Sequence, residues 1–150
     1  MAGEPSLRED VVGEHMRVLI ADDSDAIVQR LVTMLADTDG LEIVGRAGTV
    51  LEASRAVRTL KPDVLILDLR MPGGSGIDVL DSVKKEAMNV VVIVLTNHTR
   101  SQYRKKCLER GAHFFMDKST EFEMVPGVLS RLIHDAASRP EEHRDHAVRN

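Results

Sequence analysis

The chain has 150 residues, a formal net charge of -4 at pH 7 and a pI near 5.9, which is enough chain for one domain with a buried core. Its single cysteine, Cys107, excludes an intramolecular disulfide and is typical of a reducing cytoplasm. We interpret the basic residues as scattered, and the apolar runs are too short to cross a bilayer, so we expect a cytoplasmic protein that binds neither nucleic acid nor membrane.

Strands and helices are expected to alternate along most of the chain. Residues 1–14 are polar and acidic, and we interpret them as a flexible leader and not as a signal peptide. From Met16 onward, short apolar runs alternate with stretches of helical periodicity. The expected strands are 16–21, 41–47, 63–68, 90–96 and 113–117, and the expected helices are 24–37, 49–60, 76–87, 101–110 and 126–137. We therefore predict a folded domain over 15–137, followed by a polar, disordered tail over 138–150.

This alternation, with several strands apolar almost throughout, predicts an α/β fold whose parallel sheet is covered on both faces. Ligands of such sheets bind beyond the carboxyl ends of the strands. Polar residues follow four of the five strands at these ends. They are Asp22 and Asp23 after the first strand, Asp68 after the third, Thr96 at the end of the fourth and Lys118 after the fifth.

The residue types at these strand ends favour phosphoryl transfer. Three carboxylates repel one another, and a hard divalent cation such as Mg²⁺ relieves this repulsion. Asp68 can then stay ionised and act as a nucleophile, while Thr96 and Lys118 hold the oxygens of a phosphoryl group. The glycines of "MPGGSG", which follow Asp68, are expected to let the loop bend close to this site.

Ordinary structural roles compete with this interpretation. Asp22 and Asp23 can serve as helix caps, as can Thr96. Phe115 lies in a five-residue strand, where an aromatic residue is usually part of the core. The agreement of several strand ends, and the spacing of Phe115 to Lys118, favour the functional interpretation.

Four segments carry a family resemblance: "LIADDS", "LILDLRMPGGSG", "VLTNHT" and "HFFMDKS". On these motifs, residues 16–137 resemble the receiver domain of two-component response regulators. The resemblance implies a doubly wound, flavodoxin-like (βα)5 fold with strand order 2-1-3-4-5. It also implies that Asp68 is the phosphoacceptor and that Lys118 is the phosphate-binding lysine. The implied Mg²⁺ ligands are Asp23 directly, Asp22 through water and the backbone carbonyl of Arg70. Thr96 is implied to be the switch hydroxyl, and Phe115 the switch aromatic.

The resemblance further implies a signalling cycle. A histidine kinase or a histidine phosphotransfer protein donates the phosphoryl group, and the chain catalyses only its own Mg²⁺-dependent phosphorylation and slow dephosphorylation. Thr96 and Phe115 are expected to point outward before phosphorylation and inward after it. The change remodels the face formed by the fourth helix, fifth strand and fifth helix, where a downstream protein binds. We expect a monomer or a weak, phosphorylation-dependent dimer.

Two further surfaces are expected to matter. On the first helix, Val28, Leu31, Val32 and Leu35 are spaced as a buried stripe, which leaves Ile27, Arg30 and Met34 on a flank suited to kinase recognition. Arg70 and His98 lie two residues after Asp68 and Thr96. The resemblance to receiver domains implies that residues at these two positions lie beside the path of the water that hydrolyses the phosphoform.

Two other functions remain as alternatives. The first is the receiver part of a truncated DNA-binding regulator, although the 13 residues after Ala137 are too few for an output domain, so we expect the chain to act without one. The second is an aspartate-nucleophile phosphatase of the haloacid dehalogenase type. Those enzymes have a second Asp two residues after the nucleophile, and Arg70 occupies that position here.

Overall fold

The computed structural model describes residues 15–86 and 89–138, and it has five parallel strands in one sheet. The strands are β1 (Met16–Ala21), β2 (Leu41–Ala47), β3 (Val64–Leu67), β6 (Val91–Thr96) and β7 (Phe114–Asp117). The helices are α2 (Asp25–Leu35), α3 (Val50–Leu60), α4 (Gly76–Glu86), α5 (Ser101–Glu109) and α6 (Val125–Ser138), with a 3-10 turn, η1 (Phe122–Met124), before the last. The predicted leader and tail lie outside the described residues, except for Ser138, which ends α6.

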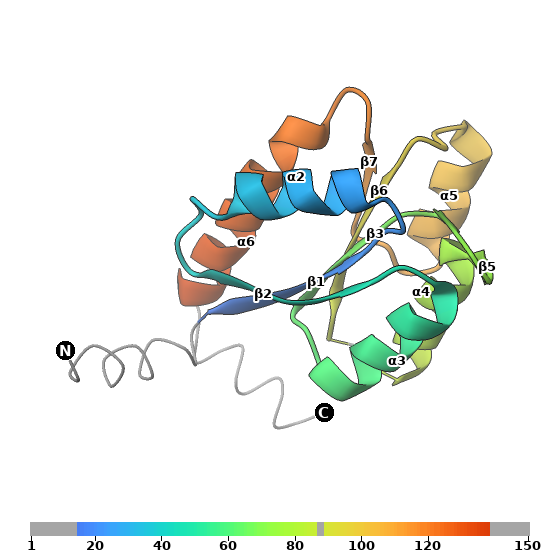
Figure 1. Ribbon diagram of the computed structural model, residues 1–150, viewed down its shortest axis with the longest axis horizontal. Helices are drawn as coiled ribbons and strands as arrows, with labels where there is room; N and C mark the ends of the chain where they lie inside the picture. Colours follow the sequence, from blue (N-terminus) through green and yellow to red (C-terminus); the bar gives the residue numbers. More distant parts are fainter. Residues whose placement is uncertain (1–14, 87–88, 139–150) are drawn as a thin grey trace.

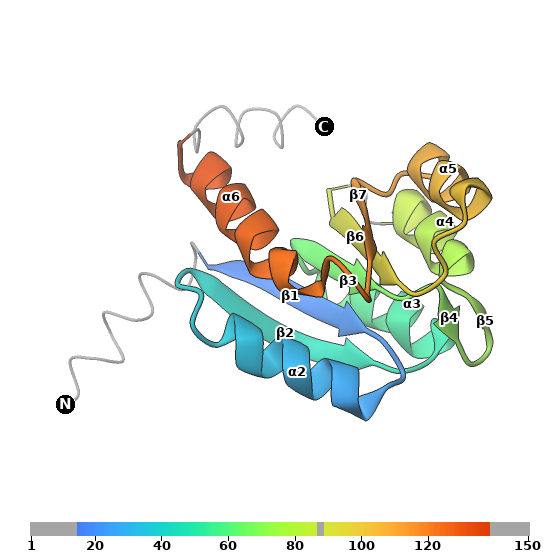
Figure 2. The ribbon, with the colours of Figure 1, turned by 90° about the horizontal axis from the view of Figure 1, so that it is seen from above.

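The sheet has the order β2-β1-β3-β6-β7, which confirms the predicted order 2-1-3-4-5. Helices α2 and α6 cover one face, and α3, α4 and α5 cover the other (Figure 1). The strand arrows point toward the side of the molecule that carries a small hairpin of β4 (Arg70–Met71) and β5 (Gly74–Ser75) (Figure 2). No helix in the described ranges is long and apolar enough to cross a membrane.

The central strands are apolar throughout because both of their faces are buried. Leu19 and Ala21 of β1 point into the core below α3, α4 and α5, whereas Val18 and Ile20 point into the core below α2 and α6. All four side chains are fully buried. Successive side chains of a strand face opposite sides of the sheet, so a doubly covered strand needs apolar residues at every position.

Helix α2 begins as predicted but is rotated relative to the predicted stripe. Ser24 caps it by accepting a 3.2 Å hydrogen bond from the Ile27 amide. Val28, Leu31 and Leu35 are buried as expected, but Val32 is 37% exposed, so its predicted burial is wrong. Ile27 and Met34 pack partly buried against the core instead.

This rotation changes the interpretation of the flank assigned to kinase recognition. Ile27 and Met34 are not an exposed apolar pair, because both pack against the core. Arg30 is exposed, and its guanidinium carbon lies 4.1 Å from the centre of the Phe122 ring, which links α2 to η1. That α2 contacts a kinase stays a prediction, without the apolar pair on which it was based.

Cys107 lies on the buried face of α5 and has no exposed surface. Burial raises the pKa of its thiol, against the smaller opposite effects of the Arg110 and Lys106 charges. The thiolate fraction at neutral pH is therefore low, which agrees with the predicted packing role.

The glycine loop after Asp68 turns back on the strand that precedes it. Gly73 and Gly74 have positive φ angles of 91° and 143°. Gly73 lies in the turn between β4 and β5, and Gly74 begins β5, in a hairpin that the sequence analysis described only as a loop. A Cβ atom on Gly76 would lie 2.5 Å from the main-chain oxygen of Asp68 and 2.8 Å from the Cα of Leu69. Of the glycines in this loop, Gly76 is therefore the one that lies closest to the main chain of Asp68 and Leu69 and has the least room for a side chain.

We predict that Gly76→Ala lowers the free energy of unfolding by roughly 1–3 kcal/mol, because the new methyl group meets main-chain atoms that cannot move aside. The matched control is Gly127→Ala in α6, where a Cβ meets nothing within 4 Å. It should leave stability unchanged or raise it by up to about 1 kcal/mol. Denaturant unfolding followed by circular dichroism measures both, and equal stabilities for the two variants would contradict the packing argument.

Candidate functional site

Four strand ends bring the predicted polar residues to one edge of the sheet. Asp22 follows β1, Asp68 follows β3, Thr96 ends β6 and Lys118 follows β7. All four are buried, with exposed fractions of 3%, 7%, 0% and 9%, while the neighbouring Asp23 is exposed. These four are the buried polar or charged residues of the described core, and they all lie at this edge.

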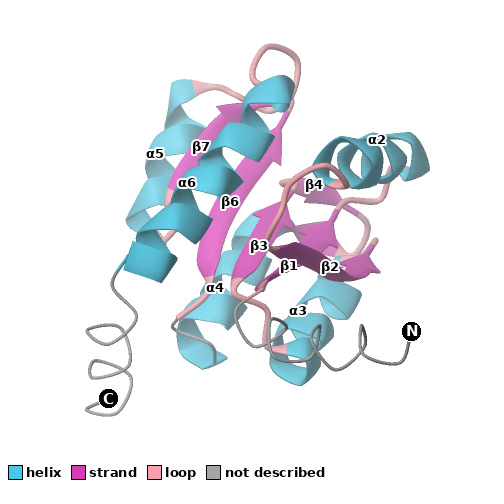
Figure 3. Ribbon diagram, turned by 90° about the vertical axis from the view of Figure 1, so that its left-hand side faces the viewer, coloured by secondary structure: helices cyan, strands magenta, loops and turns pink. Residues whose placement is uncertain are grey.

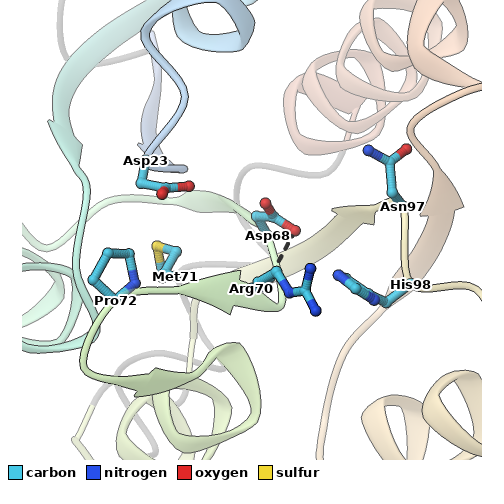
Figure 4. Close-up of a pocket in the computed structure, with 7 residues that line it drawn as sticks. All are labelled: Asp23, Asp68, Arg70, Met71, Pro72, Asn97 and His98. Carbon is cyan, nitrogen blue, oxygen red and sulfur yellow. Dashed lines mark hydrogen bonds between the residues drawn. The ribbon is translucent and has the colours of Figure 1, made fainter.

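The three carboxylates form one acidic cluster. Asp22, Asp23 and Asp68 each offer an oxygen, and these oxygens lie within 4.8 Å of one another. Main-chain amides orient two of the carboxylates: Ser24 donates to Asp22 Oδ1 at 2.8 Å, and Arg70 donates to Asp68 Oδ1 at 3.3 Å (Figure 4). Oxygen donors of this number and charge suit Mg²⁺, so the residues present fit the predicted cofactor.

Lys118 crosses the cluster and pairs with two of its members. Its Nζ donates to Asp22 Oδ2 at 2.7 Å and to Asp68 Oδ2 at 3.1 Å. Burial by itself would lower the pKa of Lys118, but the hydrogen bond to Asp22 and the charges of Asp68 and Asp22 outweigh it and raise the pKa. One ammonium therefore offsets two buried carboxylates, and the site retains a net negative charge that a cation can neutralise.

The two predicted switch residues are both buried. The Thr96 hydroxyl oxygen accepts a 3.1 Å hydrogen bond from the His98 amide. Phe115 is 6% exposed and belongs to the core below α3, α4 and α5. The expectation that Phe115 points outward in the absence of a phosphoryl group therefore does not describe this conformation, because the core already holds its ring. The outward position of Thr96 stays a prediction.

A cavity of about 530 Å³ opens beside Asp68. Figure 4 shows that Arg70 and His98 lie on one side of Asp68, and that Asp23 lies on the other. Both residues predicted to lie near the hydrolytic water are thus in this cavity. Its lining is formed by Asp23, Asp68, Arg70, Met71, Pro72, Asn97 and His98.

The structure adds supporting residues that the sequence interpretation did not identify. The Ser119 hydroxyl donates to the Asn97 side-chain oxygen at 3.1 Å, which joins the loops after β6 and β7. Arg46, at the end of β2, pairs with Asp25 at 2.6 Å beside the acidic cluster. Asn97 and Ser119 directly follow Thr96 and Lys118 in sequence, and that adjacency was the available signal.

Comparison with known proteins agrees with this arrangement. The family model described as the response regulator receiver domain matches residues 18–128, which contain every site residue named above. This chain belongs to the response regulator receiver domain family. The receiver domain spans about half the length of the curated relatives it matches.

Individual relatives support the same assignment. Response regulator GacA of Pseudomonas viridiflava is 34% identical over 119 residues, which cover 79% of this chain and 55% of that protein. The response regulator domain of Thermotoga maritima CheB is 31% identical with a TM-score of 0.71, over 81% of this chain and 96% of that one. A chain of the CheX-CheY-BeF3-Mg²⁺ complex from Borrelia burgdorferi is 28% identical with a TM-score of 0.67, over 76% and 89% of the two chains.

We predict that Lys118→Met lowers the free energy of unfolding by roughly 3 kcal/mol in the presence of EDTA, because it leaves Asp22 and Asp68 buried without their cation. The raised pKa of Lys118 sets the pH dependence. The stabilisation that protonated Lys118 gives the folded state is fully present below 10.5, the ordinary pKa of a lysine. It is lost as the pH rises through the higher pKa that Lys118 has in the folded state.

The stability difference between the wild type and Lys118→Met should accordingly be constant from neutral pH to about 10 and shrink above that. Denaturant titrations at several pH values measure it. Lys85→Met, which removes an exposed lysine of α4, is the control and should change stability little. Equal losses for the two variants would show that the Lys118 pairs add nothing to the fold.

Proposed function

We propose that this receiver domain accepts a phosphoryl group on Asp68 and signals through a phosphorylation-dependent change of its surface. The observation that carries the proposal is the position of Asp68. Its carboxylate lies at the end of a buried strand, within hydrogen-bonding distance of Lys118, and faces an open cavity. A carboxylate that is both electrostatically supported and accessible from one side suits a nucleophile.

The transfer step uses residues that lie at this edge of the sheet. An Asp68 oxygen attacks the phosphorus of a phosphohistidine, a P–O bond forms, the P–N bond breaks, and the imidazole of the donor takes up a proton. Lys118 and Thr96 hold the phosphoryl oxygens, because an ammonium and a hydroxyl offset the charge that these oxygens carry. The donor is a histidine kinase or a histidine phosphotransfer protein.

Asp22, Asp23 and Asp68 would hold Mg²⁺, together with the backbone carbonyl of Arg70. The bound ion would neutralise the carboxylates and let the negatively charged phosphoryl group approach. The Borrelia burgdorferi relative is described as a complex with BeF3 and Mg²⁺, which supports this assignment of the cofactor.

Signalling depends on Thr96 and Phe115. When the phosphoryl group is bound, the Thr96 hydroxyl turns toward it and gives up the hydrogen bond from the His98 amide. The change in the space beside Thr96 alters the packing of Phe115, and α5, β7 and α6 present a different surface to a downstream protein. Catalysis is limited to self-phosphorylation and slow hydrolysis of the phosphoform, in a cytoplasmic protein that is a monomer or a weak dimer.

Two points about the whole protein belong to this proposal. We propose that the receiver acts without an output domain of its own, with the receiver part of a longer DNA-binding regulator as the alternative. The intact mass of the endogenous protein decides between them. The phosphatase alternative is disfavoured, because Arg70 stands where that class places its acid.

We predict that Asp68→Asn abolishes Mg²⁺-dependent labelling by acetyl phosphate, since the amide nitrogen and oxygen cannot form the acyl phosphate. Labelling is measured as acid-labile, base-labile phosphate in the intact protein. Asp37→Asn, an exposed carboxylate remote from the site, is the control and should label like the wild type. Undiminished labelling of Asp68→Asn would overturn the assignment of the acceptor.

We predict that the phosphoform is long-lived and that Arg70→Asn hydrolyses several-fold faster, with little change in early labelling. Arg70 lines the cavity beside Asp68, where a long cation can cover the phosphate, whereas a shorter amide can orient the attacking water. Single-turnover decay after removal of the donor measures the rate. Arg55→Asn on α3 is the control, and decay of Arg70→Asn at the wild-type rate would exclude Arg70 from this role.

A further inference from the structure

Five of the 20 basic residues of the chain lie close together near one helix, although the others are scattered as we expected. Between positions 100 and 110, five residues are Arg or Lys and one is acidic, which gives this segment a net charge of +4 in a chain whose total is -4. Most of the segment is α5, which runs alongside the edge strand β7 (Figure 3). A local excess of one charge on an acidic protein indicates a surface with its own binding preference.

One side of α5 combines this charge with exposed apolar surface. Arg104 and Lys105 precede Leu108 by four and three residues, so the three side chains lie on the same side of the helix. Leu108 is 42% exposed, and Arg104 and Lys105 are exposed. We call these three residues the α5 basic patch. Within the described ranges, Lys105 has no carboxylate partner, whereas Arg110, on the opposite flank, pairs with Asp81 at 2.7 Å.

Arg104 also contacts the predicted switch aromatic. Its Nη1 donates to the main-chain oxygen of Phe115 at 3.4 Å, and its guanidinium carbon lies 5.6 Å from the centre of the Phe115 ring. Both contacts are weak, because the hydrogen bond is long and the cation lies near the outer limit of cation–π distances. A carboxylate that binds Arg104 can therefore compete with them.

We propose that the α5 basic patch docks an acidic segment of a partner protein, and that Arg104 couples its occupancy to the position of Phe115. Carboxylates of the partner pair with Arg104 and Lys105, and an apolar side chain covers Leu108, which gives an apolar centre with a charged rim. A nucleic acid fits less well, because the net charge of -4 repels phosphates and Leu108 offers them nothing. The patch lies on the face of α5, β7 and α6 that the proposed function assigns to a downstream protein, and the docking part adds the acidic chemistry of that partner. The coupling part rests on the proposed switch.

The docking part is tested with a fluorescent peptide in which glutamates flank a central leucine, and with a matched peptide that has glutamines instead. Anisotropy titrations at low salt should show binding of the glutamate peptide only. Lys105→Glu should weaken it by about tenfold, and Leu108→Ser should also weaken it. Lys85→Glu, the same charge change on α4, should alter the affinity less than twofold.

If Lys105→Glu and Lys85→Glu weaken peptide binding equally, the overall charge of the protein and not the α5 basic patch determines the affinity. That result would overturn the proposal. Tighter binding of a random DNA duplex than of the glutamate peptide would instead assign the patch to nucleic acid. A doubled mass in light scattering without peptide, lost in Lys105→Glu, would assign it to a second copy of this chain. Either result would replace the acidic segment as the proposed partner of the α5 basic patch.

The coupling part is tested by the same titration after treatment with acetyl phosphate and Mg²⁺. The affinity of the wild type should change by about threefold or more, while Arg104→Gln should bind weakly with or without treatment. Normal labelling of Asp68 with an unchanged affinity would refute the coupling alone. Absent labelling with intact peptide binding would overturn the proposed function and leave the docking surface standing.

Discussion

The bridge from Lys118 to Asp22 and Asp68 is the interaction on which this site depends. Two carboxylates that are more than 90% buried are costly unless a cation and hydrogen bonds compensate them, and Lys118 supplies the cation at 2.7 and 3.1 Å. The three residues follow three different strands, so only the complete sheet brings them together. The fold and the chemistry of the site are therefore linked by the same contacts.

The positive charge of Lys118 does not balance the negative charge of the acidic cluster. One ammonium faces three carboxylates whose ligand oxygens lie within 4.8 Å of one another, and the remaining negative charge favours a divalent cation. The main-chain amides of Ser24 and Arg70 hold the carboxylates in place, and the glycine loop, with Gly76 against the Asp68 main chain, leaves Asp68 open to a cavity. The proposed acceptor is therefore fixed in position and accessible from one side.

The sequence was sufficient for the alternation of strands and helices, which follows from periodicity, and for the residues that meet at the sheet edge, which stand at strand ends. The strand order followed only from the family resemblance of the short motifs. It was insufficient where side-chain packing decides. The burial of Val32 was overestimated because apolar spacing defines a stripe only to within about one helix position, and neighbours then favoured Ile27 and Met34. The buried Phe115 ring, the contact of Arg104 with it and the β4–β5 hairpin depend on tertiary contacts that spacing does not encode.

Borohydride trapping locates the phosphoryl group that we assign to Asp68. Borohydride reduces an aspartyl phosphate to homoserine, and mass spectrometry of the peptides then locates the changed residue. After treatment with acetyl phosphate and Mg²⁺, homoserine is expected at position 68 and at no other aspartate. Homoserine at Asp22 or Asp23, or at none of the three, would contradict this assignment.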